Sequence, residues 1–302
     1  QETPGYQTIE ESTYDNWKAS KDQVNCREHV DRGGAVDYGP SAVVRPIGFG
    51  KRSAEAPCVD TGTAAYVKFD RSFDKKEHLD SAFEGVDGLL VLGCCPTKDI
   101  SDTAKMLFDA AREKGIGHVV CLSPQGASKK TGVLHMDSMC DMEEHLRNCG
   151  LSYTILRPAL CMEYFLSDES LCSLREGCLE MPLSPDRPVD LVSAADVGHV
   201  VAEAFLVSKK LNGKEIDLVA DRLSMIEIAS ALGRTFSKQV ECRKADGPMN
   251  DYFRWMEENA IHGDIGRVSE FLNRFNIHLT TFRDYLLETK DTVSFEKFAK
   301  AA

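Results

Sequence analysis

The sequence predicts an α/β protein in which a doubly wound parallel sheet is followed by a smaller mixed α/β lobe. Three observations predict this fold. Short apolar runs alternate with helical patterns from residue 41 onward, residues 89–92 are apolar at every position, and the alternation changes after Pro158. Alternating strands and helices produce right-handed crossovers and parallel strands. A strand that is apolar on both faces is typical of a sheet covered by helices on both sides.

The first 40 residues differ from the rest in composition. They contain eight acidic and four basic side chains, show no sustained apolar period, and end in turns at Gly33-Gly34 and Gly39-Pro40. Such a segment is predicted to be an extended arm rather than a packed unit. The predicted organisation is therefore an N-terminal arm at 1–40, a sheet domain at 41–160, and a smaller lobe at 161–302 that is interleaved with the sheet.

The sheet domain is predicted from runs of apolar, strand-forming residues separated by helical patterns. The predicted strands are Ala42–Val44, Ala64–Phe69, Leu89–Leu92, His118–Leu122 and Ser152–Leu156. The predicted helices, in which apolar residues recur on one face, are Lys75–Phe83, Asp102–Lys114 and Asp137–Asn148. A glycine follows each of these helices, as expected for a left-handed C-terminal cap.

The smaller lobe is predicted to mix strands and helices. Its strands are Val189–Val192, Glu215–Val219 and Gln239–Arg243, and its helices are Ala194–Val207 and Ser224–Leu232, followed by a mostly helical remainder. Ser193 is expected to cap the first of these helices. Ser224 and Glu227 have the S-x-x-E spacing of a capping box at the second.

Composition excludes several classes of function. The chain has 302 residues, 42% of them hydrophobic and 28% charged, which is the range of ordinary globular proteins. Its net charge of -12 disfavours nucleic acid and anionic membrane surfaces as partners. No apolar run reaches the roughly 18 residues needed to span a bilayer.

The cysteines indicate a reducing environment. There are 11, an odd number at irregular spacing, which argues against a disulfide framework, and none has metal-site spacing. We therefore expect an intracellular protein. Because the chain begins with Gln1, the expected compartment is the cytoplasm or an organelle reached after removal of a leader.

Several motifs occur in the order of one protein family. They are Phe83–Gly88, Lys114–Val120, His135–Ser138, Gly150–Pro158, Asp196–Gly198 and Thr281–Tyr285. Together they resemble the NmrA-like family of atypical short-chain dehydrogenases, over about residues 42–285. The resemblance implies a Rossmann-like dinucleotide-binding sheet.

The chain departs from this family in two motifs. The family opens with a strand and a G-x-x-G-x-x-G turn that lets the backbone approach a pyrophosphate. The matching stretch, Tyr6–Lys21, contains no glycine, so the first βα unit is altered or missing. The family also carries H-x-x-S-K, and here Met139 follows Ser138. A thioether cannot donate the charged hydrogen bonds of that lysine.

The resemblance implies a remnant cofactor site made of Arg45, Asp70, Gly93, Cys94, Ser123, His135 and Pro158. Arg45 could pair with a 2′-phosphate or be a surface charge at a strand end. Ser123 ends a strand, where ligands of α/β proteins bind, or is a turn hydroxyl. His135 is a motif remnant or a loop histidine. Asp70 supports a turn, and Cys94 faces the cofactor or is a small buried residue.

These departures predict a non-catalytic protein with no catalytic residues, no metal and no cofactor. It would be a scaffold, accessory or regulatory subunit of an assembly, bound to protein partners through the arm and an exposed sheet edge. The alternative is an NADP-dependent oxidoreductase or an NAD(P)H-binding redox sensor with a rebuilt phosphate site. A DNA-binding regulator is disfavoured by the acidic charge.

Overall fold

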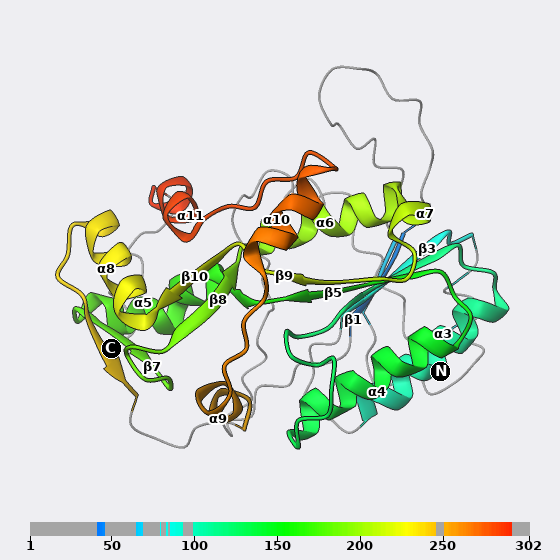
Figure 1. Cartoon of the computed structure of the whole chain (residues 1–302), viewed down its shortest axis with the longest axis horizontal. Coiled ribbons are helices and arrows are strands. Elements are labelled where there is room, and N and C mark those ends of the chain that lie inside the picture. The colour runs from blue at the N-terminus through cyan, green and yellow to red at the C-terminus, as the bar shows by residue number, and fades with distance from the viewer. Residues whose placement is uncertain are drawn as a thin grey trace, which may run out of the picture.

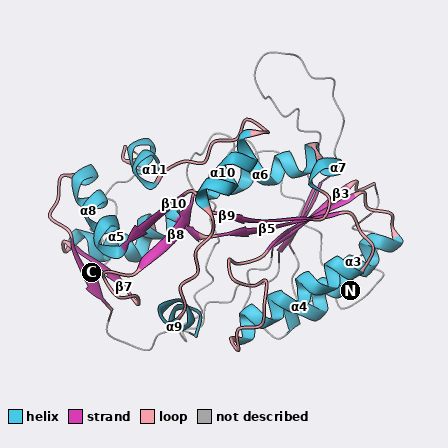
Figure 2. Ribbon diagram, viewed as in Figure 1, coloured by secondary structure: helices cyan, strands magenta, loops and turns pink. Residues whose placement is uncertain are grey.

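A computed structural model of the chain describes residues 41–45, 65–68, 79, 83, 85–92, 99–245 and 251–291. It confirms the predicted α/β fold with a covered sheet (Figures 1 and 2). The predicted arm at 1–40 lies outside the described residues. So does most of the helix predicted at 75–83, of which Leu79 is helical and, with Phe83, buried.

The main sheet has six strands in the order β2-β1-β3-β4-β5-β9. Their bounds are β1 (Ser41–Arg45), β2 (Ala65–Lys68), β3 (Gly88–Leu92), β4 (His118–Leu122), β5 (Tyr153–Pro158) and β9 (Lys214–Leu218). Strands β3, β4, β5 and β9 are mutually parallel. Their carboxyl ends point toward the smaller lobe (Figure 1).

Strand β1 departs from the predicted parallel arrangement. β1 is antiparallel to both β2 and β3, with Ser41 opposite Leu92 and Arg45 opposite Gly88. A parallel pair needs a crossover, usually a helix, whereas neighbouring strands without one can pair antiparallel. The sequence has no predicted helix between residues 45 and 64. β1 covers the side of β3, so the strand at this end of the sheet is β2. Partner binding through an exposed sheet edge stays a prediction.

Helices cover both faces of the sheet (Figure 2). One face carries α3 (Asp99–Glu113) and α4 (Leu134–Asn148), and the other carries α6 (Ala194–Leu206) and α10 (Ile265–Asn273). A short helix, α7 (Ser208–Leu211), follows α6. Each face buries its own apolar cluster against the strands. Helix α4 begins three residues before the predicted start, because Met136 is fully buried in the first cluster.

The smaller lobe contains more strands than the sequence predicted. A three-stranded sheet has the order β10-β8-β6, and a parallel pair joins β11 to β7. The strands are β6 (Leu160–Cys161), β7 (Cys178–Met181), β8 (Pro188–Val192), β10 (Asp221–Ser224) and β11 (Glu241–Lys244). The helices are η1 (Met162–Leu166), α5 (Asp168–Arg175), α8 (Met225–Phe236), α9 (Asp251–Glu258) and α11 (Phe282–Thr289). This lobe has its own apolar core.

Both predicted helix caps are confirmed. The Ser193 side chain accepts a hydrogen bond from the Asp196 N–H at the start of α6. At α8, Ser224 accepts from the Glu227 N–H, and the Glu227 carboxylate accepts from the Ser224 N–H, which completes the capping box.

We expect Ser224→Ala to lower the free energy of unfolding by about 1 kcal/mol, because it leaves N–H groups of the first turn of α8 unpaired. Urea denaturation of both proteins measures the difference. The control is Ser269→Ala, at an exposed helical position in α10, which should change stability by less than about 0.5 kcal/mol. Equal effects of the two substitutions would contradict the capping role.

Candidate functional site

The carboxyl ends of β4 and β5 bring two of the predicted site residues together. The Ser123 N–H donates to the Leu156 carbonyl at 3.0 Å, and the Gln125 N–H donates to the Pro158 carbonyl at 3.2 Å. The Ser123 side chain is buried, at 2% exposure, and its Oγ has no hydrogen-bond partner among the described residues. A buried hydroxyl without a partner is uncommon, and this one lies where α/β folds bind ligands.

The other predicted site residues do not join this pair. The antiparallel direction of β1 places Arg45 opposite Gly88, at the amino end of β3 and away from the edge that holds Ser123. His135 is half-buried in the first turn of α4 rather than in a loop. Asp70, Gly93 and Cys94 lie outside the described residues.

Ser138 and Met139, which stand where the family has its Ser-Lys pair, are buried in the protein interior. Ser138 Oγ donates to the Leu134 carbonyl at 2.8 Å, one turn earlier in α4. Met139 is completely buried in the apolar cluster under the sheet. A lysine at this position would bury its charged amine in apolar surroundings without a hydrogen-bonding partner, which is energetically costly. Position 139 therefore faces the core.

A polar network that the sequence did not predict lies beside Gln125. Its centre is Asp190 in β8, whose side chain is fully buried. Gln125 Nε2 donates to Oδ2 at 2.8 Å, and Arg222 Nε donates to Oδ1 at 2.5 Å. The Gly263 N–H donates to Oδ2 at 2.6 Å, and His262 Nδ1 lies 3.6 Å from Oδ1. The carboxylate thus joins the loop after β4, two strands of the smaller lobe and the segment after α9.

One signal in the sequence could have revealed this network. Asp190 interrupts an otherwise apolar strand, and a carboxylate in a buried strand requires donors. The identity of those donors could not be predicted, because Gln125 and Gly263 lie 65 and 73 residues away.

Helix α9 spans the two lobes next to this network. Trp255 belongs to the apolar cluster of the sheet domain, Phe253 packs against the cluster of the smaller lobe, and Met256 contacts both. The Glu257 carboxylate holds the end of the helix, since it accepts from the Ser184 N–H at 3.1 Å and from Lys244 Nζ at 2.9 Å. Figure 1 shows α9 on the same side of the sheet as α3 and α4.

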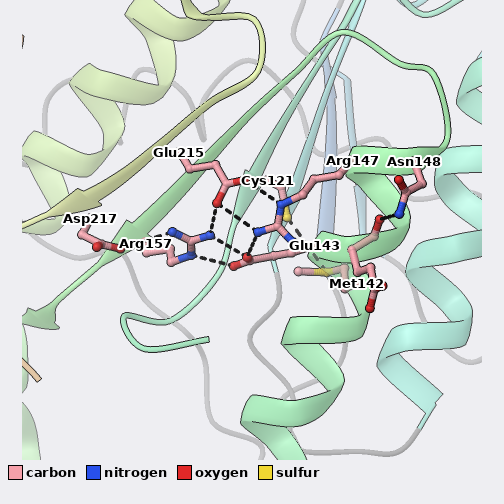
Figure 3. A network of polar contacts seen from close by, with 9 residues as sticks. Cys121, Met142, Glu143, Arg147, Asn148, Arg157, Glu215 and Asp217 are labelled. Atoms are coloured by element: carbon pink, nitrogen blue, oxygen red, sulfur yellow. Dashed lines mark hydrogen bonds and ion pairs between the residues drawn. The ribbon is translucent and has the colours of Figure 1, made fainter. Parts of the chain in front are cut away.

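A second buried network ties α4 to β5 and β9 (Figure 3). Arg157 donates to both oxygens of Glu143, at 2.8 and 2.6 Å, and Glu143 is fully buried. Arg147 donates to Glu215 at 2.6 and 2.9 Å, while Arg157 also contacts Glu215 and Asp217. The hydrogen bonds from Arg147, followed by those from Arg157, lower the pKa of Glu215 to about 2. Because every charge has a partner, this network is structural.

The comparison with known families gives the assignment. The NmrA-like family matches residues 42–289, most of the chain. The chain belongs to the NmrA-like family. Prestalk A differentiation protein A of Dictyostelium discoideum is 22% identical over 271 residues, covering 84% of this NmrA-like chain and 78% of that protein.

Solved structures share the fold of this NmrA-like chain. The NADPH-dependent quinone oxidoreductase of Escherichia coli, in complex with NADPH, has a TM-score of 0.60 and 18% identity, covering 72% of this chain and 81% of that one. NmrA, a negative transcriptional regulator, in complex with NAD, has a TM-score of 0.52 and 15% identity, covering 74% and 81%. Both neighbours bind a dinucleotide. That agrees with the predicted alternative of NADP and not with the expectation of no cofactor.

The described residues of this NmrA-like chain fit a dinucleotide only in part. The Ser123 hydroxyl, which has no partner in the part of the chain that the structure describes, offers a hydrogen bond at the carboxyl edge. Met139, in contrast, replaces the cationic donor of the family motif and faces the core. The stretch matching the family's glycine-rich turn lies outside the described residues.

The described ranges contain no group of three or more His, Cys, Asp or Glu side chains able to hold a metal ion. The described cysteines that can be assigned are free thiols: Cys121, Cys140, Cys149, Cys161, Cys178 and Cys242. No described helix of this NmrA-like chain has the length and apolar character required to cross a membrane.

Proposed function

We propose that this NmrA-like chain is a non-catalytic scaffold or regulatory protein that acts through contacts with protein partners. The observation that carries the proposal is the fate of the Ser-Lys pair. The Ser138 hydroxyl is bonded to its own helix, and Met139 is sealed in the core. No charged donor from this motif reaches the carboxyl edge, so the groups that would hold a ribose and tune an acid are missing.

Two features support a role in binding rather than turnover. The Asp190 network and α9 fasten the smaller lobe onto the loop after β4, beside the edge where a reaction would occur. A structural neighbour, NmrA, is itself a negative transcriptional regulator. The first 40 residues, with their excess of acidic side chains, remain the proposed partner-binding segment.

A turnover assay tests the absence of catalysis. NADPH oxidation is followed with menadione as a quinone acceptor, and the Escherichia coli quinone oxidoreductase serves as positive control. We expect the rate with this chain to equal the rate of the buffer. A rate above buffer that Ser123→Ala abolishes would contradict the proposal, because it would place chemistry at the carboxyl edge.

The second candidate is an NADP(H)-binding sensor or oxidoreductase. It is favoured by the Ser123 hydroxyl, which no described residue pairs with, and by the dinucleotides in the solved neighbours. Calorimetric titration with NADPH and NADH tests it. A dissociation constant in the micromolar range that Ser123→Ala weakens tenfold or more would support this candidate. The matched control is Ser128→Ala, an exposed position in the same loop, which should leave the affinity unchanged. The absence of binding at millimolar cofactor would reject it.

A further inference from the structure

The loop after β4 contains a narrow slot at Gly126. This glycine has a φ of +92°, a backbone conformation that other residues rarely adopt. A Cβ at this position would lie 2.4 Å from Trp255 Cη2 and 3.0 Å from Cζ3. The missing side chain therefore admits an aromatic ring directly against the backbone.

The walls of the slot suit a flat ring. Met136 Cε lies 3.3 Å from the same Cβ position, so a thioether borders the indole. Tyr252 stacks on Trp255, with ring centroids 6.4 Å apart and ring planes inclined by 27°. Glycine, thioether and a stacked phenol are surroundings that hold planar aromatic groups. Trp255 fills the slot and is only 9% exposed.

The loop that forms the slot also holds a second feature that points to a ligand. Ser123 is three residues before Gly126, and its hydroxyl is buried without a partner among the described residues. Tryptophan cannot satisfy this hydroxyl by accepting a hydrogen bond, since the indole nitrogen only donates. The loop therefore combines an aromatic ring packed on a glycine with a buried hydroxyl that no described residue satisfies.

We infer that Trp255 is a built-in occupant of a binding slot for a planar aromatic ring that carries a hydrogen-bonding group, and that such a ring competes with it. The ring could belong to a nicotinamide dinucleotide or to a free quinone. Glu257 and the Asp190 network hold the helix and the segment after it, so the indole, rather than the helix, moves. A protein that is mostly in the filled state binds such a ligand with correspondingly reduced affinity. This inference goes beyond the proposed function and does not depend on it.

Calorimetry of Trp255→Ala with NADPH and with menadione tests the inference. We expect at least tenfold tighter binding of one of these probes than in the wild-type protein. A gain for NADPH alone identifies a dinucleotide slot, and a gain for menadione alone identifies a quinone slot. The control is Phe253→Ala, on the same helix but packed against the smaller lobe, which should give no gain. Equal affinities in the wild-type protein and Trp255→Ala, or an equal gain in the control, would overturn the inference.

Two further measurements separate a binding slot from an artificial hole. Adding Ser123→Ala to Trp255→Ala should cancel the gain in affinity, whereas binding in a cavity created by the substitution would not need the Ser123 hydroxyl.

The chain has two tryptophans, so Trp17→Phe leaves Trp255 as the sole fluorescent tryptophan in an otherwise intact protein. Saturating ligand should shift its emission to longer wavelength and increase its quenching by acrylamide. Unchanged emission at saturation would reject displacement, even if Trp255→Ala fails to fold. Turnover by Trp255→Ala would contradict only the proposed absence of catalysis.

Discussion

Replacing Glu143 with alanine is expected to lower the free energy of unfolding by about 3–5 kcal/mol, because it leaves a buried guanidinium without its main partner. Glu143 is completely buried, and the Arg157 side chain is only 5% exposed. Both oxygens of Glu143 accept hydrogen bonds from Arg157, and one also accepts from Arg147 at 2.8 Å. Urea denaturation at neutral pH measures the loss.

The matched control replaces both partners of the buried pair. Glu143→Leu combined with Arg157→Met removes the two charges together, so it should be far less destabilising than Glu143→Ala. Glu215→Gln, at a more exposed member of the network, should also cost less than Glu143→Ala. A loss below about 1 kcal/mol for Glu143→Ala would show that the pair does not hold α4 to β5.

The second large effect is a loss of stability in mild acid caused by His118. Burial lowers the pKa of this histidine to about 4 from 6.5. Its ring nitrogens lie 2.8 Å from Ser152 Oγ and 2.9 Å from Thr154 Oγ1, at the starts of β4 and β5. The folded protein therefore keeps the ring neutral at pH values where the unfolded chain already binds a proton.

The sign of the effect follows from this difference. The contribution of His118 to the free energy of unfolding is complete above pH 6.5. It decreases by about 1.4 kcal/mol per pH unit down to about pH 4, a total of about 3 kcal/mol. Glu215 affects stability at lower pH than His118 does. Because its pKa is depressed to about 2, its contribution to stability is present above pH 4.5 and disappears as the pH falls toward 2. Stability measured by urea denaturation at pH 7, 5.5 and 4.5 isolates the His118 window.

His118→Gln should flatten the profile between pH 6.5 and 4, even if it is less stable at pH 7. His199→Gln, at an exposed position in α6, should keep the wild-type slope. If His118→Gln retains the full slope, a group other than His118 governs acid stability.

Local features of the fold could be predicted from the sequence because they depend on neighbouring residues. The caps at Ser193 and Ser224 follow from spacings of three residues, and both are present. The apolar strands at 89–92 and 118–122 follow from runs that only a covered sheet can bury. The order in which the motifs occur along the chain was enough to identify the family.

Features that depend on distant residues could not be predicted in the same way. The direction of β1 depends on what connects it to β2, and an apolar run of three residues carries no information on direction. The slot at Gly126 depends on Trp255, which lies 129 residues later in the sequence, and neither residue stands out within its own segment. Of the predicted site residues, Ser123 and Pro158 lie near each other because they stand at the carboxyl ends of β4 and β5, which are adjacent parallel strands.

The reversed direction of β1 has a consequence for the segment that precedes it. Since Ser41 pairs with Leu92, the chain enters the sheet at the carboxyl edge and leaves β1 at the opposite side. Ser41, which follows the first 40 residues in the chain, therefore lies at the edge that holds Ser123. A tether raises the local concentration of whatever it carries. A partner captured by the segment before Ser41 would be held near the edge where we propose that ligands bind, so ligand binding and capture of the partner would influence each other.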